Sequence, residues 1–270
     1  MIGFAVLVVL GLNWMPGLDQ RAEEYLKYAM ADNLLIYATA RSLNGIISVI
    51  QSVELSVSLG AGVAVNLGEI LDPLNDLIER FSAFVLYGLA GLGLQKLVLI
   101  ATSGLVMKVI TTVGLVLGYA AYLFRAGLHG WLVRLVTLIL LVRFAFIVEV
   151  GVIATLDSLY FDKQKDEAHS ALQLAQKSLG QLREEYMAAI SESGLYGGLW
   201  ESVGTIVGSD EQEGVADIAA SAIVELIVIT LVRGLILPLI FVWMLVVAGR
   251  LLLNPRGYPE QRKIPGLEVR

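Results

Sequence analysis

Long apolar runs alternate with polar stretches along this 270-residue sequence. A helix needs about 20 mostly apolar residues to cross the hydrocarbon core of a bilayer. A shorter run at 2–15 ends at Pro16-Gly17, where a proline breaks a helix. We interpret it as a retained N-terminal anchor or a short spanning helix, and the alternative is a cleaved or truncated segment. The longer runs lie at 103–124, 135–156 and 218–248. The pattern predicts an all-α, polytopic helical membrane protein with about four transmembrane helices.

The apolar stretch at 81–101 is harder to place, because it follows an amphipathic start at Asp72-Pro73. It does not fit as a separate span if the polar residues before it and those at 157–217 lie on the same side of the membrane. We therefore predict a partly inserted or re-entrant helix. The alternative is one long helix that continues into 103–124. Small residues let helices approach closely, and this region contains Gly88, Gly91, Gly93, Gly114 and Gly118.

Two polar segments carry apolar seams with the spacing of packed helices. From Leu26 to Ile50 the seam positions alternate three and four residues apart, with Asn33 as a polar member that sets register. A second seam covers three heptads from Ala168 to Ala189, typical of a coiled coil or a helical hairpin that stands off the membrane. The first seam belongs to a helix that packs in its own subunit, a helix that lies on the membrane, or a self-association surface.

Together the seams exceed what one small bundle buries, so we expect a homo-oligomer. The residues predicted to form its seam are Leu172, Leu179, Leu182, Leu43 and Ile47.

Composition supports an integral membrane protein. Apolar residues make up 57% of the chain, charged residues only 16%, and the mean hydropathy is +0.75. A typical soluble domain contains about 25% charged residues. The absence of cysteine excludes disulfides and thiolate metal sites, so the polar regions are held together by packing.

The net charge of −6 is unevenly distributed, and this predicts an orientation. Residues 19–80 carry four bases and nine acids, and residues 157–217 carry four bases and twelve acids. By contrast, 125–143 carries three bases and no acid, and the tail 250–270 carries five bases and two acids. Short basic loops stay in the cytoplasm, which predicts an inner-membrane, multi-pass protein with a cytoplasmic C-terminus. No basic external surface suggests a nucleic-acid partner.

Motifs for known chemistry are absent from the sequence. It contains no phosphate-binding loop, dinucleotide-binding glycine pattern, nucleophile elbow or zinc-protease motif, and His129 and His169 are isolated. The acids near Asp72 lack the glycine-centred loop of a calcium site. We expect no catalytic, cofactor-binding or metal site, and therefore no enzyme.

Charged residues inside the apolar runs are the best candidates for a functional site, because such residues usually face protein or water. The run at 135–156 contains Arg143 and Glu149. At about 1.5 Å per residue, Lys108, Glu149 and Arg233 fall roughly 20–24 Å from the inner surface on three helices. We predict an intramembrane charge cluster of these three residues. It forms a structural salt bridge or a water-lined ion path, unless each side chain extends separately to the interface.

Two function classes follow from these features. The first is an oligomeric inner-membrane scaffold or interaction protein, with the bilayer and an external protein as partners. The second is a channel or transporter subunit with a polar intramembrane site. The predicted segments are an anchor (1–17), external amphipathic helices (18–80), a membrane region (81–156) with a cytoplasmic turn (125–134), an external heptad helix and acidic loop (157–217), a transmembrane helix (218–249) and a basic tail (250–270).

Overall fold

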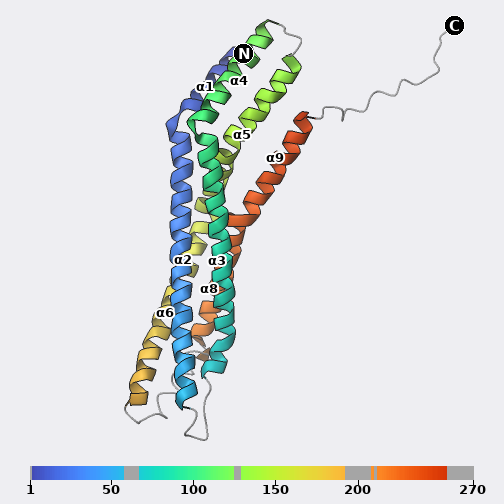
Figure 1. Ribbon diagram of the computed structural model, residues 1–270. Coiled ribbons are helices and arrows are strands. Elements are labelled where there is room, and N and C mark those ends of the chain that lie inside the picture. Colours follow the sequence, from blue (N-terminus) through green and yellow to red (C-terminus); the bar gives the residue numbers. More distant parts are fainter. Residues whose placement is uncertain (1, 58–66, 125–128, 192–207, 210–211, 254–270) are drawn as a thin grey trace, which may run out of the picture. The chain divides into compact units, whose positions relative to one another are not determined.

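Helices form nearly all of the protein that the structure describes (Figure 1). The computed structural model describes residues 2–57, 67–124, 129–191, 208–209 and 212–253. Its helices are α1 (Ile2–Trp14), α2 (Pro16–Val57), α3 (Leu67–Ser103), α4 (Leu105–Leu123), α5 (His129–Leu156), α6 (Asp162–Ser191), α8 (Val215–Leu231) and α9 (Leu237–Leu253). Two π-helical turns, η1 (Asp157–Phe161) and η2 (Val232–Ile236), and an antiparallel pair of short strands, β1 (Gly208–Ser209) and β2 (Gln212–Glu213), complete these elements.

The all-α membrane fold predicted from the sequence is confirmed. Five helical stretches in the described ranges are long and apolar enough to cross a membrane: 16–51, 71–103, 105–123, 130–185 and 215–253. Three of them contain the long spans expected from the sequence. The stretches at 16–51 and 71–103 are additional, and they fall where we expected external or partly inserted helices. Helix α1 is apolar but has only 13 residues.

Several expected boundaries differ from the observed ones because helices continue through them. Helix α3 is uninterrupted from Leu67 to Ser103, with Pro73 inside it, so no helix begins at Asp72-Pro73. Only Gly104, in an extended conformation, separates α3 from α4. This arrangement is close to the alternative in which the stretch 81–101 continues into 103–124 as one long helix. Helix α5 likewise continues through η1 into α6, with helical backbone angles at Leu156, so Asp157 does not begin a separate segment. Residues 125–128, 192–207 and 254–270 of the predicted turn, acidic loop and tail lie outside the described residues.

The chain divides into two compact units. The first unit contains Met1–Arg21, Val98–Glu149 and Leu239–Arg270, and the second contains Ala22–Leu97 and Val150–Pro238. Within the second unit, α2, α3, α6 and α8 run side by side (Figure 1) and share one apolar core. The eight positions of the seam between Leu26 and Ile50 are all buried. This seam is therefore the contribution of α2 to the core of its own unit.

The surface of the second unit changes character along the bundle. Large apolar side chains are exposed on one part of it, including Leu35 on α2, Leu86 and Leu94 on α3, and Val228 on α8. Charged side chains are exposed on the other part, including Arg80 on α3 and Lys163 and Glu184 on α6. An exposed apolar band on spanning helices suits lipid, whereas the charged part suits water.

Glycines bring α3 and η2 into backbone contact inside the second unit. A Cβ atom added to Gly91 would collide with the carbonyl oxygen of Gly234, and one added to Gly88 would lie 2.5 Å from Cγ2 of Thr230. Small residues permit such a close crossing of membrane helices. Pro238 lies just beyond η2, and because proline has no amide N–H to donate to the preceding turn, it favours an irregular turn there.

A similar contact joins α4 and α5 in the first unit. Added Cβ atoms at Gly114 and Gly118 would lie 3.4 Å from Cδ1 of Ile139 and 3.0 Å from Cγ2 of Val136, respectively. The Gly114-x-x-x-Gly118 face is thus a packing surface between neighbouring helices, as its spacing predicts.

We expect Gly91→Ala and Gly93→Ala to have opposite effects on stability in detergent. The added methyl of Gly91→Ala has no space against Gly234, and overpacking of this kind costs about 1–3 kcal/mol. An added Cβ at Gly93 meets nothing within 4 Å. That change should instead stabilise the helix by about 0.5–1 kcal/mol, because alanine loses less backbone entropy than glycine. Thermal unfolding of the two variants measures the difference, and equal melting temperatures would contradict the crossing.

Candidate functional site: two buried charge networks

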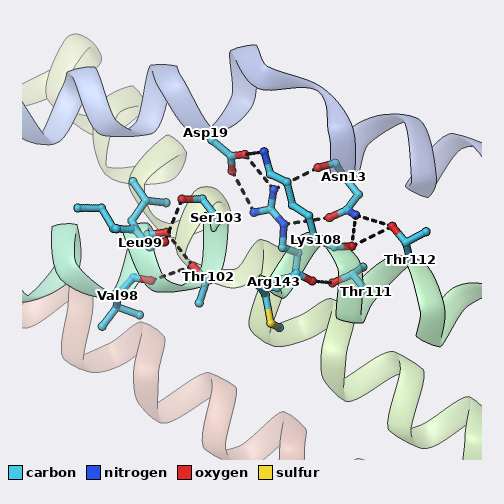
Figure 2. A network of polar contacts seen from close by, with 12 residues as sticks. Asn13, Asp19, Val98, Leu99, Thr102, Ser103, Lys108, Thr111, Thr112 and Arg143 are labelled. Carbon is cyan, nitrogen blue, oxygen red and sulfur yellow. Dashed lines mark hydrogen bonds and ion pairs between the residues drawn. The ribbon is translucent and has the colours of Figure 1, made fainter. Parts of the chain in front are cut away.

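The first unit contains a network around Asp19 of α2, which we call the Asp19 network (Figure 2). The carboxylate of Asp19 accepts two hydrogen bonds from the guanidinium of Arg143 on α5, both 3.0 Å long. It also lies 2.9 Å from Nζ of Lys108 on α4. Arg143 is buried, with 1% of its side chain exposed. One acid thus joins two bases from two other helices.

Asn13 of α1 completes the Asp19 network. Its Oδ1 accepts a hydrogen bond from Nε of Arg143 (3.0 Å), and its Nδ2 donates to the carbonyl oxygen of Lys108 (3.0 Å) and to the hydroxyl of Thr112 (3.2 Å). Trp14 donates to the same hydroxyl (3.0 Å). No side-chain atom of Asn13, Asp19 or Arg143 is a buried polar atom without a partner. The network is closed, as expected of a cluster that fastens helices together.

The second unit contains a different network around Arg233 of η2, which we call the Arg233 network. Nε of Arg233 lies 3.1 Å from Asp157 of η1, and its Nη1 lies 3.8 Å from Asp32 of α2. Lys165 of α6 lies 3.1 Å from the same oxygen of Asp32. The hydroxyl of Tyr25 donates a hydrogen bond to Asp157. Both bases and Asp157 are almost completely buried.

Unlike the Asp19 network, the Arg233 network leaves buried polar atoms without hydrogen bonds. These atoms are Nε and Nη2 of Arg233, Oδ1 of Asp157 and Oδ2 of Asp32, although two of them lie at ion-pair distance from an opposite charge. The side chain of Gln95, buried on α3 in the same unit, has no partner either. Buried polar groups are normally hydrogen-bonded, so atoms of this kind indicate bound water, an ion or a functional site.

Both π-helical turns carry members of the Arg233 network. Asp157 is the first residue of η1, and Arg233 is the second residue of η2. A π-helical turn inserted in an α-helix often occurs at functional sites. Here the two turns present an acid and a base to each other across the bundle.

The three residues of the predicted cluster belong to two units: Lys108 and Glu149 lie in the first and Arg233 lies in the second. Lys108 pairs with Asp19, and Arg233 pairs with Asp157 and Asp32. Glu149 is buried, and neither of its carboxylate oxygens has a hydrogen-bond partner among the described residues. The depth estimate assigned each charge a level in the membrane, but it contains no information on which face of its helix the charge occupies. The cluster of all three residues therefore stays a prediction.

The residues predicted to form an oligomerisation seam lie inside the second unit. Leu43 and Ile47 of α2 are fully buried against α6, whose Leu172, Leu179 and Leu182 belong to the same core. This seam therefore fits the interpretation of a helix that packs in its own subunit. The five residues contribute to the apolar core of the second unit. The side chains of Tyr186 and Ala189, at the end of the predicted heptads, lie outside the described residues.

Three acids of these networks are absent from the predicted site. Asp19 and Asp32 fall in a segment interpreted as external, and Asp157 stands at an expected boundary. A usable signal was present, since Arg143 and Arg233 each require an acid wherever they are buried. Within the described residues no group of three or more metal-binding side chains lies together.

Comparisons with known proteins do not add an assignment: the chain matches no protein-family model, no curated protein and no solved structure.

We expect Leu172→Lys to unfold the second unit, because it buries an unpaired charge in a packed core. The matched control is Leu174→Lys on the same helix, where 64% of the leucine is exposed and a lysine meets water. Thermal unfolding and mass determination in detergent measure both effects. A Leu172→Lys variant that melts like the parent but loses an oligomer would contradict this description and restore the predicted seam.

Proposed function

We propose that this protein is a channel or transporter subunit and that the Arg233 network is its polar intramembrane site. The observation that carries the proposal is a set of buried charged atoms without hydrogen bonds inside helices apolar enough to cross a membrane. Charged side chains at such depth are costly and typically mark ion pathways or proton relays. The Asp19 network has similar charges but complete bonding, which suits a purely structural role.

Exposed apolar neighbours support a membrane position for the network. Asp32 lies between Tyr28 and Leu34 on α2, and both of these are more than half exposed. Arg233 similarly lies between Val228 and Leu235, both with exposed side chains. An apolar exterior around a charged interior is the arrangement expected of a polar site enclosed by spanning helices.

The network also reaches the exposed surface of the second unit. Nζ of Lys165 lies 3.3 Å from Asp162 and 3.9 Å from Asp166, whose side chains are 43% and 74% exposed. From Lys165 the contacts continue through Asp32 and Arg233. They end at Asp157 and Tyr25. The acids of this chain, Asp162, Asp32 and Asp157, are of the residue type that forms proton relays, so protons are the first candidate for the transported species. Arg233 stays protonated and supplies a fixed positive charge beside Asp32 and Asp157.

Proton flux into proteoliposomes tests the proposal. The parent protein should collapse an imposed pH gradient. Asp157→Asn keeps the size of the side chain but removes its charge. It should slow the proton flux at least about tenfold, which corresponds to a contribution of about 1.4 kcal/mol by the carboxylate to the limiting step. The control is Glu167→Gln, since Glu167 is exposed and pairs with Lys163 one turn away.

Two results would contradict the proposal. One is a parent protein that conducts neither protons nor monovalent ions under any imposed gradient. The other is an Asp157→Asn variant that remains folded and conducts as fast as the Glu167→Gln control.

A scaffold or interaction protein is the second candidate, and the charged part of the bundle surface favours it. This part of the second unit has exposed charges on α3 and α6 around an apolar core. A stable polar bundle attached to spanning helices suits the docking of an external protein. Homo-oligomers remain part of this candidate, with a contact surface other than the buried seams.

For the orientation, we propose a cytoplasmic C-terminal tail in an inner membrane, with the charged end of the bundle outside. The basic residues around Arg134 and Arg250 support this, because short loops rich in arginine and lysine stay in the cytoplasm. A reporter that is active only outside the membrane should work when inserted near Gly208 and fail after Arg270. Activity at the tail would reverse the orientation.

A further inference from the structure

An apolar groove lies in the first unit, and none of its lining residues belongs to a charge network. It has a volume of about 320 Å³ and is formed by three helices. Its walls include Ile2 and Val6 of α1, Leu115 and Tyr119 of α4, and Val133 and Val136 of α5. This volume falls within the usual size of sites for small molecules.

Glycines, which have no side chain, help to form the groove. Gly118, which lines it, has no side chain to occupy the space beside Val136. Gly3 of α1 approaches the hydroxyl group of Tyr119 so closely that an added Cβ would lie 2.9 Å away. The three helices therefore meet closely around the groove without filling it.

Basic and aromatic side chains lie at the end of the first unit where the groove is found. Arg134 follows directly after the groove residue Val133 and is exposed, and the sequence from 105 to 148 contains no acid. Arg250 of α9 lies at the same end, because its neighbour Gly249 packs against Leu138 of α5. Trp131, one helical turn before Arg134 on α5, is 62% exposed. Exposed tryptophan together with arginine is typical of the headgroup region of a membrane.

We propose that this groove binds one acyl chain of an anionic phospholipid, with the phosphate held by Arg134 beside it. The apolar walls match a hydrocarbon chain, and the guanidinium group of Arg134 matches a phosphate, which arginine binds with paired hydrogen bonds. Anionic lipids are attracted to basic residues at the membrane surface, whereas neutral lipids are not. The charge at the groove therefore selects the headgroup, and the groove holds the chain. This proposal does not depend on the proposed function.

Native mass spectrometry of the full-length protein from a neutral detergent tests the site. The probes are phosphatidylglycerol and phosphatidylcholine with identical acyl chains. The parent should retain phosphatidylglycerol with a preference of about fivefold for each arginine that contacts the phosphate. Val133→Trp and Val6→Phe narrow the groove from opposite walls, and both should abolish retention. The control is Val148→Trp, which changes an exposed position of α5 outside the groove.

The headgroup contact has its own variant and control. Arg134→Gln should reduce the preference for phosphatidylglycerol about fivefold and leave the retention of phosphatidylcholine unchanged. Arg41→Gln, at an exposed base of the second unit, should change neither. Glycerol phosphate, which has the headgroup charge without the chains, should not displace the bound lipid.

Any of the following results would overturn the proposal: equal retention of the two lipids by the parent, undiminished retention by both groove-filling variants, or displacement of the lipid by glycerol phosphate. A protein that retains no lipid and forms a dimer through this face would overturn it as well.

Discussion

Pairing of buried charges is the constraint on which this structure depends. A bundle of apolar helices has no water to stabilise a guanidinium or ammonium group, so each buried base must meet an acid from another helix or remain at a large cost. Arg143 meets Asp19 in the first unit, and Arg233 meets Asp157 in the second. Each pair joins helices distant in sequence. The apolar core then supplies most of the burial, while the pairs fix which helix faces lie together.

The same constraint separates structure from function. When every polar atom of a buried network is hydrogen-bonded, no atom is left to bind an additional ligand without breaking an existing bond. The Asp19 network is of this kind, with Asn13 accepting hydrogen bonds from Nε and Nη2 of Arg143 through its side-chain and backbone oxygens. The Arg233 network keeps unpartnered atoms, and the two π-helical turns that hold it depart from the regular helix. The candidate site is distinguished by buried charged atoms that lack hydrogen bonds.

Sequence periodicity predicted the helices and their buried faces better than the contacts of the charges. The three-and-four spacing from Leu26 to Ile50 identified eight buried positions, since the apolar face of a helix is a local property. Whether that face meets another part of the same chain is a matter of tertiary structure, and the seam of Leu43 and Leu172 belongs to one subunit for this reason. The acids that pair with Arg143 and Arg233 are far away from them in the sequence. Asp19 was missed because its segment was predicted to be external.

A double-mutant cycle between Asp19 and Arg143 tests most directly whether the pairing of buried charges stabilises the fold. Unfolding in detergent is followed for Asp19→Asn, Arg143→Met and the double variant. Asp19→Asn leaves the buried Arg143 without its acid and should cost about 3–5 kcal/mol. Arg143→Met should cost less, because Asp19 keeps its ion pair with Lys108. The double variant removes both charges, so its loss of stability should be smaller than the sum of the single losses, with a coupling energy of about 1–3 kcal/mol. Additive losses, within about 0.5 kcal/mol, would contradict the account, because they would mean that the two side chains act independently.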